Sequence, residues 1–374
     1  MDINVKEVKK RKDLKTFIYL PEKIHEEHDQ WVHPIYFDEW KYFDKNKNKA
    51  FSYCDAVLLI AYQDDKPVGR IMGIINKRYN EYRNEKTARF GYLETYEDEE
   101  IVKTLLNYVE DWARRQGMKK IIGPYGFTDQ DPEGFLIEGF DSHSTIACYY
   151  NFDWMPRFVE NQGYTKDIDY YVYLLKVPKE FPEFYNRIYE RAQKKGDYEI
   201  LEPKTKKEIR RIIKPIFHLM NECYTEENIY GYTPLDEKEM DALVKRYIPA
   251  ANPNFIKAVK KDGEVVSFVI GLPDMTEGIK KAKGRLFPFG FLKILKSAKN
   301  SEQLDLVLGA VKEKYRGRGL DVIMGVRMIK SARDAGMKVM DTHHEMEANV
   351  KVRAEMEKMG GVLHKKFRVY KKEL

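Results

Sequence analysis

A basic turn that contains two glycines holds the clearest chemistry in this sequence. Its five key residues are Lys314, Arg316, Gly317, Arg318 and Gly319. The turn follows an apolar strand-like run at 304–311 and precedes an amphipathic run at 318–336. A helix that starts here directs its free N–H groups and the positive end of its dipole at the turn. Because glycine lets the backbone approach a ligand closely, this order predicts a phosphate-binding cradle.

The turn does not match the common nucleotide-binding motifs. No GK[ST] follows a first glycine at P-loop spacing, and the GxGxxG fingerprint is absent. A purely structural role is the alternative, in which the glycines only shape a basic helix start. We favour phosphate binding because strand, turn and helix come in the required order.

Side chains that could remove a proton follow the next predicted strand, at 338–341. They are Asp341, His343, His344, Glu345 and Glu347. Histidine titrates near neutral pH and is the natural base. We take His343 and Glu347 as the catalytic candidates, with a solvated loop or a helix-capping role as the alternative. A metal site is not predicted, because adjacent ligands point apart and no Cys or His pair has ligand spacing.

Composition indicates a cytoplasmic protein of two domains. The 374 residues are 43% hydrophobic and 34% charged, and the three cysteines lie far apart. The net charge is +6, and basic residues alternate with acidic residues along most of the chain. No nucleic-acid surface is therefore expected. Since no apolar run approaches the ~20 residues of a membrane span, we expect no membrane partner. A monomer or homodimer fits equally well.

The two halves repeat one order of elements. In the first half, strands are predicted at 2–8, 55–63, 67–75, 86–94, 119–123 and 169–177, and helices at 13–25 and 98–116. In the second half, strands are predicted at 198–202, 254–260, 264–272, 304–311, 338–341 and 362–371, and helices at 206–224, 318–336 and 349–359. The phrases RRQGMK at 114–119 and RDAGMK at 333–338 mark the same point in each copy. This predicts an internal duplication of an α/β domain with a mixed sheet, divided into 1–178 and 179–374.

The second half resembles the GNAT superfamily of N-acyltransferases. The resemblance rests on Val311-x-x-x-Tyr315-Arg316-Gly317-Arg318-Gly319, a helix, the strand at 338–341, Asn349 and the Met359-Gly360-Gly361 ending. It extends over the whole chain as two GNAT-like domains in tandem, similar to uncharacterised bacterial two-domain proteins. It implies acetyl-CoA or another acyl-CoA as cosubstrate, with the pyrophosphate at the turn. It also implies a splayed strand at Ala310 and Val311 for the pantetheine arm, and a contact from Asn349.

The first copy departs from this pattern at its own turn, residues 95–100 (TYEDEE). It has neither a glycine pair nor a basic side chain, and its carboxylates would repel a pyrophosphate. We therefore predict that domain 1–178 is degenerate and binds no CoA, whereas domain 179–374 binds acyl-CoA. The segment 123–151, which has no counterpart in the second copy, is either a wall of the acceptor pocket or an excursion that seals the degenerate domain.

Two further features bear on the chemistry. The tyrosine that commonly protonates the departing thiolate in the family is Met356 here. The basic, aromatic segment 278–295 could touch a membrane or the CoA adenine. We favour the alternative that it is a connection packing Phe287, Phe289, Phe291 and Leu292 onto the sheet.

The predicted function is N-acyl transfer from acyl-CoA to an amine of a small molecule or peptide, without a metal. One alternative is a CoA-binding pseudoenzyme or sensor, which the Met356 departure favours. Another is an aminoacyl transferase of the peptidoglycan-bridge type, weakened because no long heptad run for a coiled-coil arm is visible.

Overall fold

The computed structural model describes residues 2–145, 148–224, 229–248 and 251–374. Internal contacts divide the chain into two units. Unit 1 comprises Met1–Tyr171, Met275–Lys299 and His364–Leu374, and unit 2 comprises Val172–Asp274 and Asn300–Leu363. The sequence placed a single boundary near residue 178. In the structure the chain leaves unit 1 after Tyr171 and returns to it twice.

Unit 1 is built on a mixed sheet in the order β1-β2-β3-β4-β5-β14, with β6 also paired to β14. Its strands are β1 (Ile3–Glu7), β2 (Cys54–Gln63), β3 (Lys66–Asn76), β4 (Thr87–Thr95), β5 (Lys120–Gly123), β6 (Phe135–Glu138) and β14 (Val362–Glu373). Its helices are α1 (Arg11–Ile24), α2 (Tyr36–Tyr42), α3 (Lys77–Arg83), α4 (Glu99–Arg115), α5 (Met155–Asn161), α9 (Thr276–Ala282) and α10 (Gly290–Lys299). In this sheet β4 and β5 pair in parallel.

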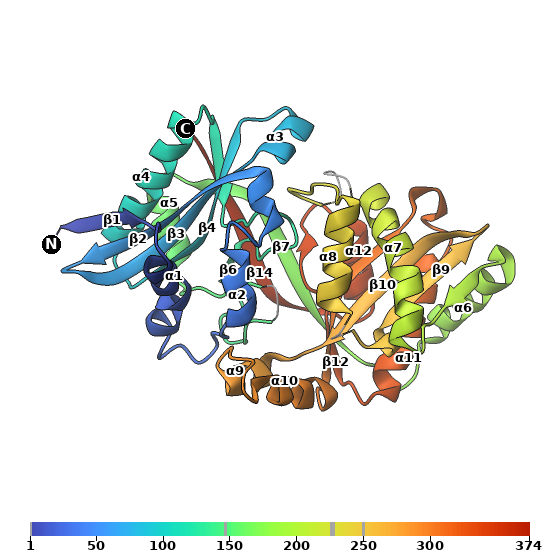
Figure 1. Cartoon of the computed structure of the whole chain (residues 1–374). Coiled ribbons are helices and arrows are strands. Elements are labelled where there is room, and N and C mark those ends of the chain that lie inside the picture. Colours follow the sequence, from blue (N-terminus) through green and yellow to red (C-terminus); the bar gives the residue numbers. More distant parts are fainter. Residues whose placement is uncertain (1, 146–147, 225–228, 249–250) are drawn as a thin grey trace. The chain divides into compact units, whose positions relative to one another are not determined.

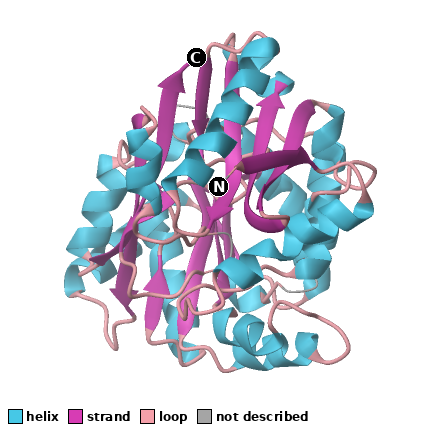
Figure 2. Ribbon diagram, turned by 90° about the vertical axis from the view of Figure 1, so that its left-hand side faces the viewer, coloured by secondary structure: helices cyan, strands magenta, loops and turns pink. Residues whose placement is uncertain are grey.

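Helices cover both faces of this sheet (Figure 2). Alternate side chains of β2 point to opposite faces, as in any strand. Val57, Leu59 and Ala61 therefore join the core under α4 and α5, while Leu58 and Ile60 join the core under α1 and α2. A strand buried on both sides reads as a continuous apolar run, which is how residues 55–63 read in the sequence.

Unit 2 repeats the plan with the order β7-β12-β11-β10-β9-β8. Its strands are β7 (Thr165–Lys176, from Val172), β8 (Glu199–Leu201), β9 (Ile256–Lys261), β10 (Glu264–Pro273), β11 (Gln303–Val311), β12 (Val339–Asp341) and the short β13 (Glu345–Met346). Its helices are α6 (Glu183–Gly196), α7 (Lys206–Cys223), α8 (Glu237–Tyr247), α11 (Leu320–Asp334) and α12 (Val350–Lys358). Here β11 and β12 are the parallel pair.

Each unit is completed by the terminal strand of the other half of the sequence. In unit 1, Tyr370 at the C-terminal end of β14 pairs with Gly123 of β5. In unit 2, Leu174–Lys176 of β7, which continue the first half of the sequence, pair with Val339–Asp341 of β12. The terminal strands of the two sequence halves are thus exchanged between the units.

The segment 278–295 differs from its prediction. It forms most of the helices α9 and α10 of unit 1 instead of a connection. Phe287, Phe289, Phe291 and Leu292 do not pack onto the sheet, since each is at least 40% exposed. None of the helices in the described parts of the chain is long and apolar enough to cross a membrane.

Candidate functional site

The two parallel strands of unit 2 part after three residue pairs. They pair at Gln303–Val339, Leu304–Met340 and Asp305–Asp341. Beyond Asp305, β11 continues along β10 alone, with a register shift at Ile270/Gly271 that marks a β-bulge. A bulge bends the strand and changes its direction. The strands β11 and β12 therefore separate after Asp305–Asp341. We call the gap between them the splay, and the last residue pair its floor.

A histidine and two buried carboxylates meet at this floor. The carboxylates of Asp305 and Asp341 are 0% and 1% exposed. The backbone N–H of His343 donates to Asp341 Oδ1 at 2.8 Å, and His343 Nε2 lies 3.8 Å from Asp305 Oδ2. His343 also adopts a positive φ of 54°, which costs a residue other than glycine about 1 kcal/mol or more. The contact from the His343 N–H to Asp341 holds the backbone of His343 in this conformation.

The pKa of the Asp305 carboxyl group is set by its burial and by the charged groups around it. Burial raises the pKa of Asp305, the nearby His343 opposes that shift, and Asp341 and Asp274 add to it. A carboxylate that faces an imidazole orients it and stabilises the imidazolium that forms when it accepts a proton. At 3.8 Å the contact between His343 and Asp305 is a close charge contact and not a hydrogen bond.

Glu345 is one of the acidic candidates that the sequence analysis did not select, and its pKa is shifted by burial. Burial raises the pKa of Glu345 to about 7, and the hydrogen bond from Asn349 and the charge of His344 oppose the shift. Asn349 Nδ2 donates to Glu345 Oε2 at 3.3 Å, and the Asn349 side chain makes no capping bond to α12. The peptide carbonyl of Glu347 accepts a hydrogen bond from Arg353 at 3.0 Å.

The predicted phosphate turn sits between β11 and α11. Gly317 and Gly319 have φ of 71° and 84°, so both need the left-handed backbone that glycine adopts freely. Gly319 is the N-cap of α11, and a Cβ there would come within 2.9 Å of Ala192 Cβ on α6. A Cβ at Gly317 would meet no atom within 4 Å. Gly319 therefore fits a tight packing contact, while Gly317 faces open space.

Three exposed cations surround this helix start. Lys314 and Arg318 lie over the ring of Tyr315, at 5.0 Å and 5.5 Å, and Arg316 Nε donates to the carbonyl of Val311 at 3.3 Å. None of the three forms an ion pair with another residue that the structure describes. Lys312, just before them, is already paired with Glu222 and Glu264. The turn thus presents uncompensated positive charge at the positive end of a helix dipole.

Ala310 and Val311 pair with Phe268 and Ser267 of β10. The neighbouring peptide of Gly309 contacts the hydroxyl of Tyr224, which follows α7, at 3.2 Å from the Gly309 oxygen and 3.4 Å from its nitrogen. The predicted site residues therefore form two groups along one strand, the splay floor at Asp305 and the basic turn beyond Val311.

A tyrosine does lie beside α12, although Met356 occupies the position expected from the family. The hydroxyl of Tyr173 on β7 donates to Glu357 at 2.8 Å and accepts from Arg353 Nε at 3.3 Å. Burial raises the pKa of Tyr173, so it stays protonated and able to donate at neutral pH.

The parallel strands of unit 1 separate in the same way, but different side chains lie where they part. Its parallel pair ends at Arg89–Ile122, the register that Asp305–Asp341 holds in unit 2. The buried guanidinium of Arg89 donates to the carbonyls of Gly126 and Phe127, at 3.2 Å and 2.9 Å, and stacks on Tyr79 and Tyr125.

The chain itself occupies the edge of β4 beyond that point. Tyr125 N–H donates to Phe90 O at 2.8 Å, and Tyr92 N–H donates to the hydroxyl of Tyr149 at 3.0 Å. Tyr125 and Phe127 are almost fully buried. The described part of the segment 123–151, which lacks residues 146–147, therefore seals the splay of unit 1.

The acidic turn of unit 1 has a capping role. Asp98 is the N-cap of α4 and accepts from the N–H of Glu100 at 2.9 Å. Glu99 accepts from Asn161 and Gln162 at the end of α5, at 3.2 Å and 3.1 Å. Carboxylates of this turn thus cap the first turn of α4. The N-cap of α11 in unit 2, Gly319, makes no side-chain capping bond.

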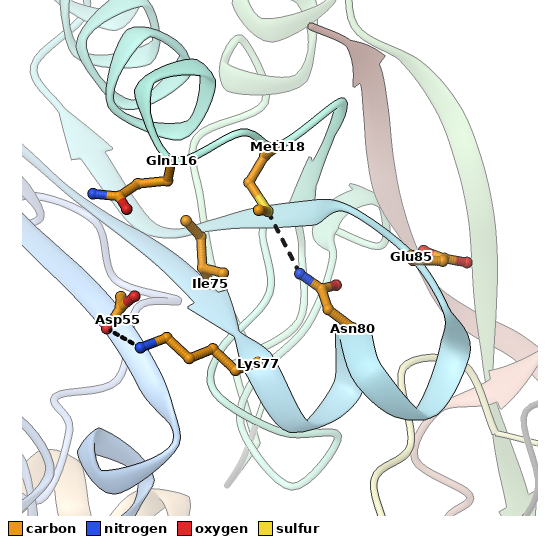
Figure 3. Close-up of a pocket in the computed structure, with 7 residues that line it drawn as sticks. All are labelled: Asp55, Ile75, Lys77, Asn80, Glu85, Gln116 and Met118. Carbon is orange, nitrogen blue, oxygen red and sulfur yellow. Dashed lines mark hydrogen bonds and ion pairs between the residues drawn. The ribbon is translucent and has the colours of Figure 1, made fainter.

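A surface hollow of about 300 Å³ in unit 1 does not belong to either splay (Figure 3). Within it, Lys77 pairs with Asp55 at 2.8 Å, and Asn80 Nδ2 contacts Met118 Sδ at 3.5 Å. Glu85, on its rim, pairs with Lys120 at 3.1 Å. With these charges mutually compensated, the hollow offers no reactive group. Among the described residues, no group of three or more His, Cys, Asp or Glu is arranged to hold a metal ion.

The sequence and the fold are similar to those of known proteins. Residues 18–126 match the family model described as acetyltransferase (GNAT) family. A GCN5-related N-acetyltransferase from Sphaerobacter thermophilus has a TM-score of 0.54 at 11% identity, over 99% of this chain and 95% of that one. A tandem GNAT protein from the clavulanic acid biosynthesis pathway has a TM-score of 0.51 at 10% identity, over 100% and 98%. These likenesses show that the chain has a tandem GNAT fold.

Two curated relatives align with nearly the whole chain. A bacterial ceramide synthase of Caulobacter vibrioides is 26% identical over 380 residues, which cover 100% of this chain and 98% of that protein. The protein YghO of Escherichia coli is 24% identical over 371 residues, covering 97% and 94%. The predicted tandem GNAT fold is confirmed, and acyl transfer is supported as the class of chemistry. The family match falls on unit 1, so it supports the fold of the sealed unit and leaves the site residues of unit 2 as predictions.

Proposed function

We propose that the protein transfers an acyl group from acyl-CoA to an amine, with the reaction in unit 2. The observation that carries the proposal is the pair of groups along β11. A histidine with a buried carboxylate partner lies where the strands part, and an uncompensated basic turn lies at the end of the same strand. CoA needs an anion site for its phosphates and strand edge for its pantetheine arm, and these features supply both.

The proposed step uses few protein groups. The amine nitrogen attacks the thioester carbonyl, an amide bond forms, the carbon–sulfur bond breaks, and the CoA thiol departs with a proton. His343, oriented by Asp305, accepts the proton that the amine loses. Backbone N–H groups near Ala310 and Val311 stabilise the negative charge on the carbonyl oxygen. Because a thiol leaves readily near its pKa of about 8.5, Met356 does not block the reaction.

A long-chain amine is the acceptor class that we favour among small molecules. The full-length relative from Caulobacter vibrioides is named a ceramide synthase, and a ceramide is the amide of a fatty acid and a long-chain amino alcohol. Full-length coverage of that relative includes both units, which a shared fold alone would not require. A CoA-binding protein without transfer activity is the second candidate, which the methionine at position 356 favours.

The test is amide formation from palmitoyl-CoA, followed by mass spectrometry. Sphinganine, ethanolamine and a lysine-containing peptide serve as parallel acceptors. The proposal expects N-acyl product with sphinganine and a loss of on the order of 10²-fold in rate for Asp305→Asn. Product with only the short amine or the peptide would overturn the acceptor class. CoA binding without product from any acceptor would favour the second candidate.

A further inference from the structure

The helix α10 of unit 1, the loop before it and one residue of α2 carry a cluster of exposed apolar side chains, here called the α10 patch. It consists of Phe37, Phe287, Phe289, Phe291, Leu292 and Leu295, which are between 40% and 70% exposed. The rings of Phe37, on α2, and Phe287 make an edge contact at 6.1 Å. Single exposed apolar residues are ordinary on a protein surface, but a contiguous aromatic cluster marks a binding surface.

The patch stands on a firmly anchored element. Ile279, Ala282 and Ile294 are buried and pack against the loop and start of α2. A Cβ at Gly278 would come within 2.6 Å of Ile294 Cα, which shows how closely α9 and α10 pack (Figure 1, orange). The peptide carbonyl of Gly284 accepts from Tyr36 N–H at 3.0 Å. The exposed rings are therefore displayed on fixed structure.

Arg285 adds a charged anchor between the two helices. Its guanidinium binds both carboxylate oxygens of Glu22 on α1, at 3.0 Å and 2.9 Å, and lies over the ring of Tyr36. A bidentate contact fixes orientation as well as distance. The same residue closes the turn from α9, since Arg285 also donates to the carbonyl of Lys283 at 2.9 Å.

The exposed apolar side chains of α10 lie in one sector of the helix. At 100° per residue, Phe291, Leu292 and Leu295 span about 100° of the helix circumference, and the buried Ile294 lies about 60° outside that sector. Lys299 falls within the same sector, Lys296 lies about 40° beyond its edge at Leu292, and Lys293 lies about 100° beyond that edge. This is the arrangement of a helix that lies in an interface, with rings in the apolar layer and lysines reaching to the polar layer.

Charge is concentrated in this segment. Residues 275–299 contain seven basic residues and one acidic residue, a net charge of +6, which equals the net charge of the whole chain. The remainder of the sequence is therefore balanced. No ion pair joins Lys283, Lys296 or Lys299 to another described residue. The α10 patch combines exposed apolar side chains with nearby lysines. A surface complementary to it has an apolar layer beneath an anionic outer layer.

We propose that the α10 patch docks unit 1 onto an anionic membrane surface. The aromatic rings enter the boundary between headgroups and acyl chains, and the surrounding lysines contact lipid phosphates. Neither helix is long enough to span a bilayer, so the contact is interfacial. The sequence had predicted no membrane partner, because it contains no apolar run of spanning length and because packing of these aromatic residues onto the sheet was favoured. The proposal is independent of the transfer chemistry, although it would bring the enzyme to lipid substrates.

The test is sedimentation of the full-length protein with vesicles. Vesicles of phosphatidylcholine with phosphatidylglycerol are compared with phosphatidylcholine alone. Wild type should bind the anionic vesicles, and Phe287→Ser/Phe289→Ser/Leu295→Ser should weaken binding at least roughly tenfold. Lys283→Glu/Lys296→Glu/Lys299→Glu should also weaken it about tenfold and remove its dependence on salt. The altered side chains are exposed, and melting temperatures verify that the variants fold.

Matched controls lie in unit 2. Phe184→Ser changes an aromatic residue that is 58% exposed, and Lys207→Glu/Lys238→Glu reverses exposed charges on α7 and α8. These variants should bind vesicles as wild type does. Absence of wild-type binding would overturn the proposal. So would a wild-type dimer that the triple serine variant converts to a monomer, because the patch would then bind a second copy. Retention of transfer activity on a water-soluble amine in the patch variants would separate docking from catalysis.

Discussion

The two units have the same strand arrangement, but side chains of opposite charge lie where their parallel strands part. In both, the parallel pair ends at its third residue pair. At that register unit 1 has Arg89, whose guanidinium binds carbonyls of the unit's own loop. Unit 2 has Asp305, whose carboxylate faces a histidine. The helix that follows starts on capping carboxylates in unit 1 and on an uncompensated basic turn in unit 2.

The difference shows how one duplicated fold can have two roles. A buried cation at the splay attracts peptide carbonyls, and the segment 123–151 supplies them, so the unit 1 splay is filled by protein. In unit 2 the buried carboxylate of Asp305, which as an anion cannot donate to carbonyls, lies 3.8 Å from the His343 imidazole. Under the proposed function, the residue type at one register separates a structural unit from a reactive one, which gives four ways to break or sharpen the comparison.

The largest effect is expected at His343. His343→Gln removes the proton acceptor but keeps a polar side chain, so the transfer rate should fall on the order of 10²–10⁴-fold. CoA affinity should stay within about twofold, because the phosphate turn is separate. The rate is measured by thiol release at saturating acyl-CoA.

Two neighbouring variants control for that loss. His344→Gln changes an adjacent histidine and should keep most of the activity. Glu347→Gln tests the other residue predicted from the sequence. Full activity in His343→Gln with loss in Glu347→Gln would move the base to Glu347 and leave the Asp305 contact a structural one.

Arg89 should matter for stability and not for CoA. Arg89→Leu leaves the carbonyl of Gly126 buried without its donor and removes two stacking contacts, so it should cost about 3 kcal/mol in the free energy of unfolding. Urea unfolding measures this, with the exposed Arg115→Leu as the control. A loss of CoA affinity in folded Arg89→Leu would contradict the sealed role of unit 1.

The phosphate turn can be tested with one position and two side chains. Gly317→Glu places a carboxylate in open space beside the helix start, and acyl-CoA affinity should fall about 10–100-fold. Gly317→Ala imposes the same positive φ without the charge, which costs about 1 kcal/mol of stability at most. Titration calorimetry compares the two. Equal affinities would show that the turn does not contact the phosphates.

Glu345 gives the smallest effect, and it depends on pH. Its folded-state pKa of about 7 exceeds the usual value, so its stabilising contribution is complete below about pH 4.5 and is lost as pH rises through 7. Glu345→Gln, which stays neutral, should therefore be more stable than wild type at pH 8 and close to it in stability at pH 4.5. Equal stability of the two proteins at both pH values would contradict the perturbed pKa.

Much of the fold could be predicted because its long elements have clear periodicity. The strand at 55–63 was placed within one residue of β2, and the helix at 98–116 within one residue of α4. The short helices α9 and α10 could not be predicted, because Gly284, Pro288 and Gly290 read as breakers between aromatic residues. The exchange of β7 and β14 was also beyond the sequence, because duplicated halves contain equivalent strands that can pair either way.

The site was predictable only where local chemistry is visible. The glycines and cations of the turn lie together in the sequence, and His343 follows a strand end. Asp305 was missed, although an acid inside the apolar run at 304–311 was a usable signal. Arg89 inside the strand at 86–94 was the matching signal in unit 1. Their importance depends on strand register, which brings Asp305 beside Asp341 and cannot be read from spacing alone.

The most direct test is the stoichiometry of acyl-CoA binding to the full-length protein. Titration calorimetry with palmitoyl-CoA should give one molecule per chain for wild type and for Arg115→Leu in unit 1. The double variant Arg316→Glu/Arg318→Glu should abolish that single event. Two molecules per chain, or one molecule that still binds the double variant with wild-type affinity, would contradict the assignment of the CoA site to unit 2.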